Sequence, residues 1–368
     1  MFRPVWIEVD LKKLGDNFSR IKKLVGPSVK IIATVKQAAY GHGLIPVVRR
    51  LDTLGVDFFG VGSLEEAIAL RQDGLRKPIL VLSAVLDKFA RYFVEYRIHP
   101  TVVSVEFAKA INRAAAKKKI KIPVHVKIDT GMGRLGFYYE DAYRFIREIR
   151  ALAYVSAEGI FTHLPVADSN KKFTNYQIDL FNDFIRTLGR EKINFTYQHC
   201  ANSIALVNYR NAHFNMVRPG LILYGISPAP EAAIRVQPIL SLKSRVIFVK
   251  HIKKGMSVSY GRTYIARRQT TIATVAIGYA DGYPWALSGT AKVIIKDSLF
   301  PVAGRICMDH IMVDIGTRKD IAIGDEVILM GESKKYTITA EDLAVWAKTI
   351  PYEIVSRLSL KIPRIYKN

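Results

Sequence analysis

The sequence has very little cysteine. Only Cys200 and Cys307 occur in 368 residues, which is too few for a disulfide framework. His199 precedes Cys200, but two neighbouring ligands do not complete a tetrahedral zinc site, so we expect no metal. The scarcity of cysteine therefore excludes a disulfide-stabilised secreted domain and a zinc-ribbon protein.

Long apolar runs are also missing, although hydrophobic residues make up 49% of the chain. No run is long enough to cross a bilayer. The first ten residues, MFRPVWIEVD, alternate like a strand and lack the apolar core of a signal peptide. We therefore expect a globular cytoplasmic protein with no membrane partner.

Acidic residues are scarce beside basic ones. The chain has 32 Asp and Glu against 55 Lys and Arg, which gives a net charge of +23. Proteins that bind nucleic acid or anionic surfaces are often this basic. The basic residues are scattered, however, and no nucleic-acid motif accompanies them. A solvated basic surface is the simpler interpretation, and a weak, salt-sensitive association with a polyanion stays open.

The first two-thirds of the chain alternate short apolar segments with amphipathic ones. A capping box of Ser63 and Glu66 should begin one helix, and an apolar stripe marks another at 175–188. Strands are expected between the helices, at 31–35, 58–61, 79–82, 101–103, 124–128, 155–161 and 195–198. This order predicts an α/β protein, either a parallel barrel or a doubly wound sheet.

The pattern changes near residue 235. Strands are expected beyond it at 239–250, 271–277, 291–295, 310–315 and 326–330, with helical pieces only at 343–348 and 352–360. The change predicts two domains, an α/β domain at 9–234 and a β-rich domain at 235–368.

The most informative segment is VKQAAYGHG at 35–43, where Lys36 directly follows an apolar strand. Burial disfavours the ammonium form and lowers the pKa of a lysine. A neutral amine can attack a carbonyl and hold it as a Schiff base. A solvated lysine at a strand end is the commoner alternative for any single residue.

Polar side chains end further strands of the expected barrel. Barrel active sites lie at the C-terminal strand ends, so these side chains should meet in one pocket. Ser203, with the backbone N–H groups of Gly220 and Leu221, suits a phosphate. The polar side chains that end these strands are Arg134, His163, Ser203 and Arg218.

Three motifs mark the β-rich part, VSYGRTY at 258–264, IGYADGY at 277–283 and GRICMD at 304–309. Tyrosine is a common packing residue in strands, so no single one identifies a catalytic group. Together, in this order and over nearly the whole chain, all these motifs resemble the alanine racemase family.

The resemblance implies a fold, a cofactor and a partner. The fold is a (β/α)8 TIM barrel followed by a mostly-β domain, which the N-terminal strand at 1–8 joins. The cofactor is pyridoxal 5′-phosphate (PLP), and the protein forms a homodimer whose active sites take residues from both subunits. The implied reaction interconverts L- and D-alanine and supplies D-alanine for peptidoglycan.

By the same resemblance, two residues are catalytic. Lys36 carries PLP as a Schiff base and acts as the base for D-alanine. Tyr260, from the partner subunit, acts as the base for L-alanine. A tyrosine has a reference pKa of about 10 and is a poor base unless its phenolate is stabilised, and His163 matches the residue that bonds it.

The other matches surround the cofactor and the substrate. Arg218 faces the pyridine nitrogen, and an arginine there cannot readily give up a proton. Lys127 matches a lysine that family members often carry as a carbamate, which orients Arg134. The residues matched to the cofactor are Lys36, Tyr40, Arg134, His163, Asn202, Ser203, Arg218, Gly220 and Leu221. Those matched to the substrate are Arg134, Met308 and Tyr279, and those matched to the entry channel are Asp168 and Arg305.

Two positions depart from the common family pattern. Gln37 and Ala38 replace a commoner Ala-Asn or Ala-Asp pair, and Leu360 stands where some members have a tyrosine. Without that hydroxyl, the alternative of a racemase that also accepts serine stays open, because apolar pockets discriminate weakly between near-isosteres. A non-catalytic PLP-binding protein and a PLP decarboxylase are further alternatives. The second domain argues against the first of these, and Arg218 argues against the second.

Overall fold

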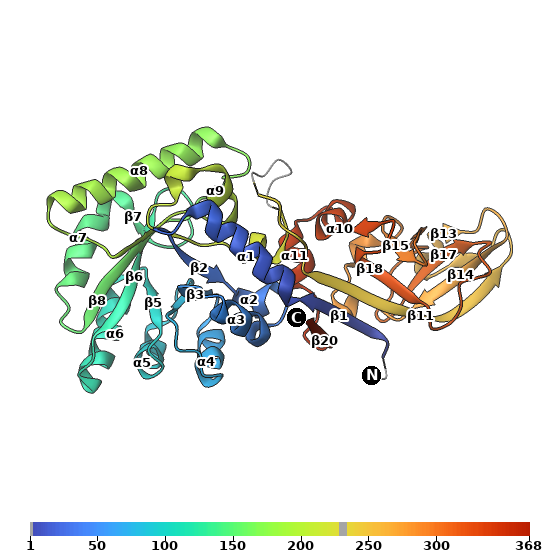
Figure 1. The fold of residues 1–368 in the computed structure, drawn as a ribbon, viewed down its shortest axis with the longest axis horizontal. Coiled ribbons are helices and arrows are strands. Elements are labelled where there is room, and N and C mark those ends of the chain that lie inside the picture. Colours follow the sequence, from blue (N-terminus) through green and yellow to red (C-terminus); the bar gives the residue numbers. More distant parts are fainter. Residues whose placement is uncertain (1–2, 228–233) are drawn as a thin grey trace.

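The computed structural model describes residues 3–227 and 234–368. A barrel of strands and helices and a mostly-β unit lie end to end along the long axis of the molecule (Figure 1). The predicted fold class is therefore confirmed, and the doubly wound sheet is excluded because the parallel strands close on themselves.

Eight parallel strands form the closed barrel. Each pairs with the next around the ring, and β10 pairs with β2 while β5 pairs with β6. The strands are β2 (Lys30–Thr34), β3 (Phe58–Val61), β4 (Ile79–Val81), β5 (His99–Val102), β6 (Ile122–Asp129), β8 (Val155–Phe161), β9 (Tyr197–His199) and β10 (Met216–Val217). The short β7 (Phe137–Tyr138) pairs with the end of β6.

Helices cover the outside of the barrel (Figure 1). They bury apolar stripes against the strands, as Ile178 and Phe181 of α8 illustrate. The helices are α1 (Leu11–Val25), α3 (Leu44–Thr53), α4 (Leu64–Gln72), α5 (Ala90–Glu95), α6 (Val105–Lys118), α7 (Tyr139–Arg150), α8 (Lys171–Arg190) and α9 (Ser203–Asn208). The helix expected at 175–188 is thus the central part of α8.

The capping box predicted for α4 forms only in part. Ser63 Oγ accepts a hydrogen bond from the Glu66 N–H at 3.3 Å. The Glu66 carboxylate does not return to the Ser63 backbone; it accepts from the N–H groups of Ala38 and Gly62, each at 2.9 Å. The prediction was wrong on this half, because a tertiary contact outcompeted the local one.

The second unit is a twisted sheet joined by the start of the chain. β1 (Val5–Asp10) pairs antiparallel with β11 and parallel with β20, so the chain begins in this sheet and enters the barrel afterwards through α1. The other strands are β11 (Leu240–Ile252), β14 (Thr270–Val275), β15 (Lys292–Ile295), β16 (Ser298–Pro301), β17 (Ile311–Gly316), β18 (Glu326–Glu332), β19 (Thr337–Ile338) and β20 (Arg364–Lys367).

Short elements complete this unit. A hairpin of β12 (Ser257–Val258) and β13 (Tyr264–Ile265) stands apart from the main sheet. The late helices are α10 (Ala340–Ala347) and α11 (Pro351–Ser356), and each begins earlier than the sequence pattern predicted. In the described ranges, no helix is long and apolar enough to cross a membrane.

Candidate active site

Lys36 lies at the C-terminal end of β2 and opens α2 (Lys36–Tyr40). The residues from Gln37 to Tyr40 all have left-handed backbone angles, with φ between 52° and 55°. This conformation costs roughly 1–2 kcal/mol per L-residue, because Cβ crowds the following carbonyl. Four such residues in succession need support from the surrounding structure, and the sequence pattern did not predict them.

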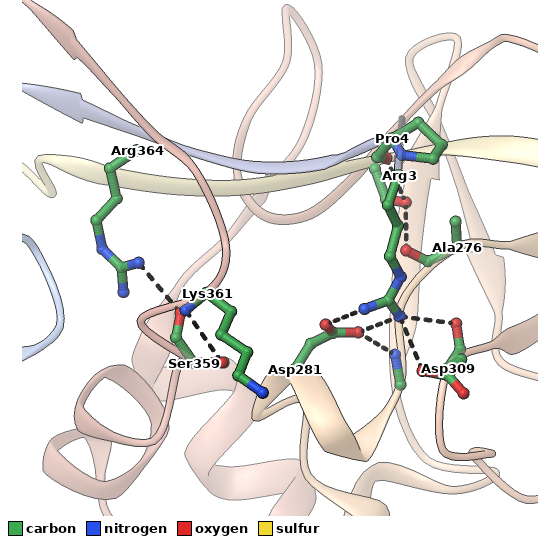
Figure 2. A network of polar contacts seen from close by, with 10 residues as sticks. Arg3, Pro4, Ala276, Asp281, Asp309, Ser359, Lys361 and Arg364 are labelled. Atoms are coloured by element: carbon green, nitrogen blue, oxygen red, sulfur yellow. Dashed lines mark hydrogen bonds and ion pairs between the residues drawn. The ribbon is translucent and has the colours of Figure 1, made fainter. Parts of the chain in front are cut away.

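Contacts from both units brace this left-handed turn. The N–H of Ala38 donates to Glu66 Oε1, as described above. Arg364 Nε donates to the carbonyl of Gly41 at 2.9 Å, and the Tyr366 hydroxyl donates to that of His42 at 3.2 Å. Arg364 also donates to the Ser359 carbonyl at 3.1 Å (Figure 2). β20 of the second unit therefore helps to position Lys36.

The surroundings of Lys36 favour its neutral amine. Burial lowers the pKa of Lys36, the charge of Arg134 lowers it further, and Glu66 opposes both effects. A neutral amine is the nucleophilic form. The alternative of a solvated lysine at a strand end is therefore not supported.

Other polar side chains from the barrel strands lie around Lys36. Burial, together with the charges of Arg218 and Arg134, lowers the pKa of Lys127 on β6 to about 8. Burial holds the pKa of His163 well below its usual range, with Arg218 the next cause, so its imidazole is neutral. His163 Nδ1 lies 3.5 Å from Arg218 Nη2. The expected convergence of strand ends is thus present.

Arg218 follows β10 and is buried without a carboxylate partner among the described residues. Its Nη1 pairs with His199 Nδ1 at 2.8 Å, and its Nη2 donates to the carbonyls of Thr162 and Cys200 at 2.8 and 3.0 Å. Burial lowers the pKa of Arg218 to about 10, so the guanidinium stays charged at neutral pH. These contacts hold it in one orientation.

Gly220, Ser203 and Tyr40 form a small polar cradle. The Gly220 N–H donates to Ser203 Oγ at 2.8 Å. A Cβ at position 220 would lie only 2.7 Å from the Tyr40 hydroxyl and 3.6 Å from Ser203 Oγ, so only glycine allows the two hydroxyls to lie this close to the turn. Two hydroxyls beside a glycine turn suit a phosphate.

Asn202 and Leu221 lie beside this cradle without offering side-chain donors to it. The Asn202 carbonyl oxygen caps α9 by accepting from the N–H groups of Ile204 and Ala205 at 3.1 and 3.0 Å. Its amide nitrogen donates to the Leu164 carbonyl at 3.2 Å. Leu221 is buried and begins a 3-10 turn. Both residues therefore shape the backbone of the cradle.

The loop after β6 carries Arg134. The Asp129 carboxylate accepts from the N–H groups of Gly131, Met132 and Gly133 at 2.8–2.9 Å, which fixes the loop. Arg134 itself is exposed at the mouth of the barrel. Asp168, in the loop after β8, is also exposed. Burial raises the pKa of Tyr352, and the charge of Asp168 raises it further.

The residues predicted from the second domain do not meet Lys36 of the same chain. Tyr260 lies between β12 and β13, and Figure 1 places β13 at the end of the molecule away from the barrel. The side chains are exposed, at 70% for Tyr260, 55% for Met308 and 44% for Tyr279. Arg305 lies beside Tyr260, because a Cβ at Gly261 would be 3.0 Å from its guanidinium carbon.

A polar network fixes the loops of Tyr279 and Met308 (Figure 2). Arg3 Nη2 donates to Asp281 Oδ2 at 2.7 Å and to the Asp309 carbonyl at 3.2 Å. The same Asp281 oxygen accepts from the Gly278 N–H at 2.9 Å. These contacts present the two side chains on one exposed surface.

Sequence reasoning missed three residues that shape the site. Asp129 had a local signal, an Asp directly before TGMG, which is typical of a side-chain-to-backbone turn. Glu66 was interpreted only as a helix cap. Arg364 lies far along the chain from the turn that it braces, so no sequence pattern could have indicated its role.

Comparisons with known proteins agree with this geometry. Residues 9–228 match the family model "Alanine racemase, N-terminal domain", and residues 239–366 match "Alanine racemase, C-terminal domain". An alanine racemase of Halothermothrix orenii is 40% identical, over 100% of this chain and 97% of the relative.

Solved structures give the same result. An alanine racemase of Clostridium difficile 630 superposes with a TM-score of 0.94 at 38% identity, over 99% of this chain and 96% of that one. The Bacillus anthracis alanine racemase with bound L-Ala-P has a TM-score of 0.94 at 31% identity, over 100% and 96% of the two chains. The chain belongs to the alanine racemase family, whose members are PLP-dependent isomerases.

Proposed function

We propose that this chain racemises alanine by a two-base mechanism in which Lys36 and the partner subunit's Tyr260 act on opposite faces of the substrate. The reaction class follows from the family, which the matches cover over nearly the whole chain. The observation that supports Lys36 is its position on a braced turn, with burial lowering the pKa of its amine. A non-catalytic PLP-binding protein is not supported, because the second domain also matches the racemase family.

The residues present fit PLP. Lys36 would hold the cofactor through Nζ, and the cradle of Tyr40, Ser203 and Gly220 would hold its phosphate. Arg218 would donate a hydrogen bond toward the ring nitrogen without giving up a proton. Bound PLP supplies an electron-withdrawing ring that stabilises negative charge at the substrate Cα.

The cradle gives a direct test of this assignment. In Gly220→Ala the new Cβ would lie 2.7 Å from the Tyr40 hydroxyl and occupy the phosphate space. Because overpacking of this kind is unfavourable, we expect PLP affinity to fall by about 10-fold or more, measured by titrating apoenzyme with PLP and following visible absorbance.

The matched control is Gly189→Ala in α8, where the nearest atom to a new Cβ is 4.0 Å away. It should leave PLP affinity unchanged. If Gly220→Ala kept the PLP affinity of the parent protein, the phosphate would not bind in this cradle.

The two bases would divide the proton transfers between them. Lys36 Nζ would take the Cα proton of D-alanine, and the Tyr260 hydroxyl of the second subunit would take that of L-alanine. In either direction one group takes the Cα proton from its own face and the other group donates a proton to the opposite face, and the two groups regain their starting protonation states by exchange with water. Neutral His163 would accept the hydrogen bond of the tyrosine hydroxyl and make it a better base. Arg134, Tyr279 and Met308 would bind the substrate carboxylate.

The exposure of several predicted site residues supports a homodimer with shared active sites. Tyr260, Tyr279 and Met308 lie on one unit with large exposed fractions, as do Trp285 and Leu360. Exposed aromatic and Met side chains of this kind are typical of protein interfaces. A second copy placing them over the Lys36 pocket would complete the site, with Asp168 and Arg305 at its entrance.

Hybrid dimers test the shared site. Lys36→Met and Tyr260→Phe subunits, carrying different tags and co-expressed, should each be inactive alone. A hybrid dimer keeps one intact site, so statistical mixing should restore about a quarter of parent activity. If purified hybrids stay inactive, Tyr260 does not act on the partner's Lys36.

Lys127 is proposed to carry a carbamate. Its pKa of about 8 supplies the neutral amine that carbon dioxide needs, with release of one proton. Arg218 and Arg134, whose charges lower that pKa, would in turn stabilise the anionic product. A carbamate here would orient Arg134 toward the substrate.

The pH dependence of stability can test this state. For the free amine, the unfolded chain binds more protons than the folded one between pH 8 and 10.5. The free energy of unfolding, relative to Lys127→Met, should therefore rise by up to about 3 kcal/mol across this window in CO2-free buffer. Adding ¹³C-bicarbonate should flatten the slope and give a ¹³C carbamate signal in NMR. A persistent slope with no signal would contradict the carbamate.

Serine racemisation is a second candidate reaction. Leu360 is 71% exposed and brings no hydroxyl to the pocket, which supports room for a slightly larger side chain. A panel of enantiopure amino acids, followed by polarimetry, separates alanine from broader specificity. Turnover of alanine alone would reject this candidate.

The cellular setting is proposed as well. We place the enzyme in the cytoplasm, where its two free cysteines suit a reducing environment, with D-alanine destined for peptidoglycan. The domain limits are proposed at 9–234 and 235–368, and the gap between the two family matches supports the second limit. Weak polyanion association rests on charge alone, and DNA binding at several salt concentrations tests it.

A further inference from the structure

Arg3 links the start of the chain to the loops that carry Tyr279 and Met308 (Figure 2). Its guanidinium donates two hydrogen bonds to Asp281, from Nη1 to Oδ1 at 2.5 Å and from Nη2 to Oδ2 at 2.7 Å. Nη2 also donates to the Asp309 carbonyl at 3.2 Å and lies 3.5 Å from the carboxylate of the same residue. A bidentate pair of this kind fixes direction as well as distance, so Arg3 holds the two loops in one relative position.

The two loops are also bonded directly to each other. The Tyr279 N–H donates to the Cys307 carbonyl at 3.1 Å, and the N–H of the following residue donates to the Met308 carbonyl at 3.0 Å. Gly278 permits this close approach, because a Cβ there would lie 2.2 Å from the Met308 carbonyl oxygen. Tyr279 and Met308 therefore lie on one connected piece of structure, which Arg3 joins to the start of the chain.

The backbone of Arg3 is held by the sheet of the second unit. β1 begins two residues after Arg3 and pairs with β11. The buried Ser244 hydroxyl of β11 lies 3.0 Å from the Pro4 carbonyl oxygen and 3.2 Å from that of Ala276, which precedes the first of the two loops. The guanidinium of Arg3 therefore extends from a backbone position that the sheet fixes.

The Asp281 carboxylate depends on this arginine. The side chain of Asp281 is only 6% exposed, and within the described ranges Arg3 is its only ion-pair partner. An exposed ion pair contributes little to stability, but removing one partner of a pair leaves a buried charge uncompensated. Loss of Arg3 should therefore shift the loop of Asp281, because the carboxylate would move toward water.

We propose that Arg3 is a positioning residue for substrate binding and that it acts on the active site of the partner subunit. This role rests on the proposed function, in which Tyr279 and Met308 of one subunit bind the substrate carboxylate over Lys36 of the other. Through Asp281 and Asp309, Arg3 fixes the relative position of these two carboxylate-binding groups. Arg3 touches neither substrate nor cofactor, so its loss should weaken substrate binding and leave both bases in place.

Arg3→Ala tests this role on the holoenzyme. We expect KM for alanine to rise about 10-fold and kcat to change less than about 3-fold, because binding is weakened equally in the ground and transition states. Arg3→Lys should give an intermediate KM, since an ammonium group can pair with Asp281 but cannot bond it bidentately. The matched control is Arg49→Ala, which breaks a bidentate pair with Asp73 between α3 and the end of α4 and should keep the parent KM.

Hybrid dimers locate the effect. In a hybrid of Lys36→Met and Tyr260→Phe subunits, the one intact site takes its loops from the Lys36→Met subunit. Arg3→Ala in that subunit should raise KM about 10-fold, and the same change in the Tyr260→Phe subunit should leave KM unchanged. Parent KM in the Arg3→Ala homodimer, or an equal rise in both hybrids, would overturn the proposal. A hybrid that is inactive with both Arg3 residues intact would instead overturn the shared site, and with it the action of Arg3 on the partner.

Discussion

Lys36→Met should lower the rate of alanine racemisation in both directions by at least about 1,000-fold. The change removes the group that would hold PLP and the base on one face of the substrate, and a positioned base alone typically contributes 10²- to 10⁴-fold. Neither Lys127 nor Arg134 can replace it, because each belongs to β6 or its following loop while Lys36 opens α2. Coupled assays from L- and from D-alanine, with visible absorbance of bound PLP, measure both losses.

The matched control is Lys30→Met at the other end of the same strand. Lys30 is exposed and pairs with Asp57 at 3.5 Å, so its loss should change activity little. Borohydride trapping of the cofactor, followed by peptide mapping, should label Lys36. A label on another lysine, or substantial activity in Lys36→Met, would contradict the assignment.

Tyr260→Phe should have the second large effect, and it should be one-sided. Removing the hydroxyl should slow proton removal from L-alanine by about 100- to 10,000-fold and affect that from D-alanine far less. The asymmetry arises because Lys36 still serves its own face of the substrate. Exchange of the Cα proton with D₂O, followed by NMR for each enantiomer, measures the two steps separately.

Tyr336→Phe is the control for this change. Tyr336 is also exposed in the second unit but lies near β19, apart from the loops of Tyr260 and Tyr279. It should keep parent exchange rates for both enantiomers. If Tyr260→Phe slowed proton exchange equally for both enantiomers, Tyr260 would not be the base for one face of the substrate.

Much of the barrel and its chemistry could be predicted from the sequence, because the relevant patterns are local. The strand β3 was predicted with the observed limits, and α8 was recognised by its apolar stripe. Both depend on side-chain periodicity, which short stretches of sequence carry. The strand β10 has only two residues, so periodicity could not define it, although the arginine after it was recognised.

Parts of the site could not be predicted, since they depend on contacts between distant residues. Glu66 fits a local cap in the sequence, yet its carboxylate reaches the turn after Lys36. Arg364 braces the same turn from β20, 323 positions away in sequence. A run of left-handed residues is unfavourable in isolation, so no local propensity predicts it.

The sequence by itself determined the order of elements, the chemical types at the strand ends and, through their resemblance, the family. Only the tertiary structure decided that the strands close into a barrel, that Lys36 sits on a strained turn, and that Tyr260 lies far from it. The physical reason is that closure, strain and distance depend on long-range packing, whereas periodicity and residue type are local properties of the chain.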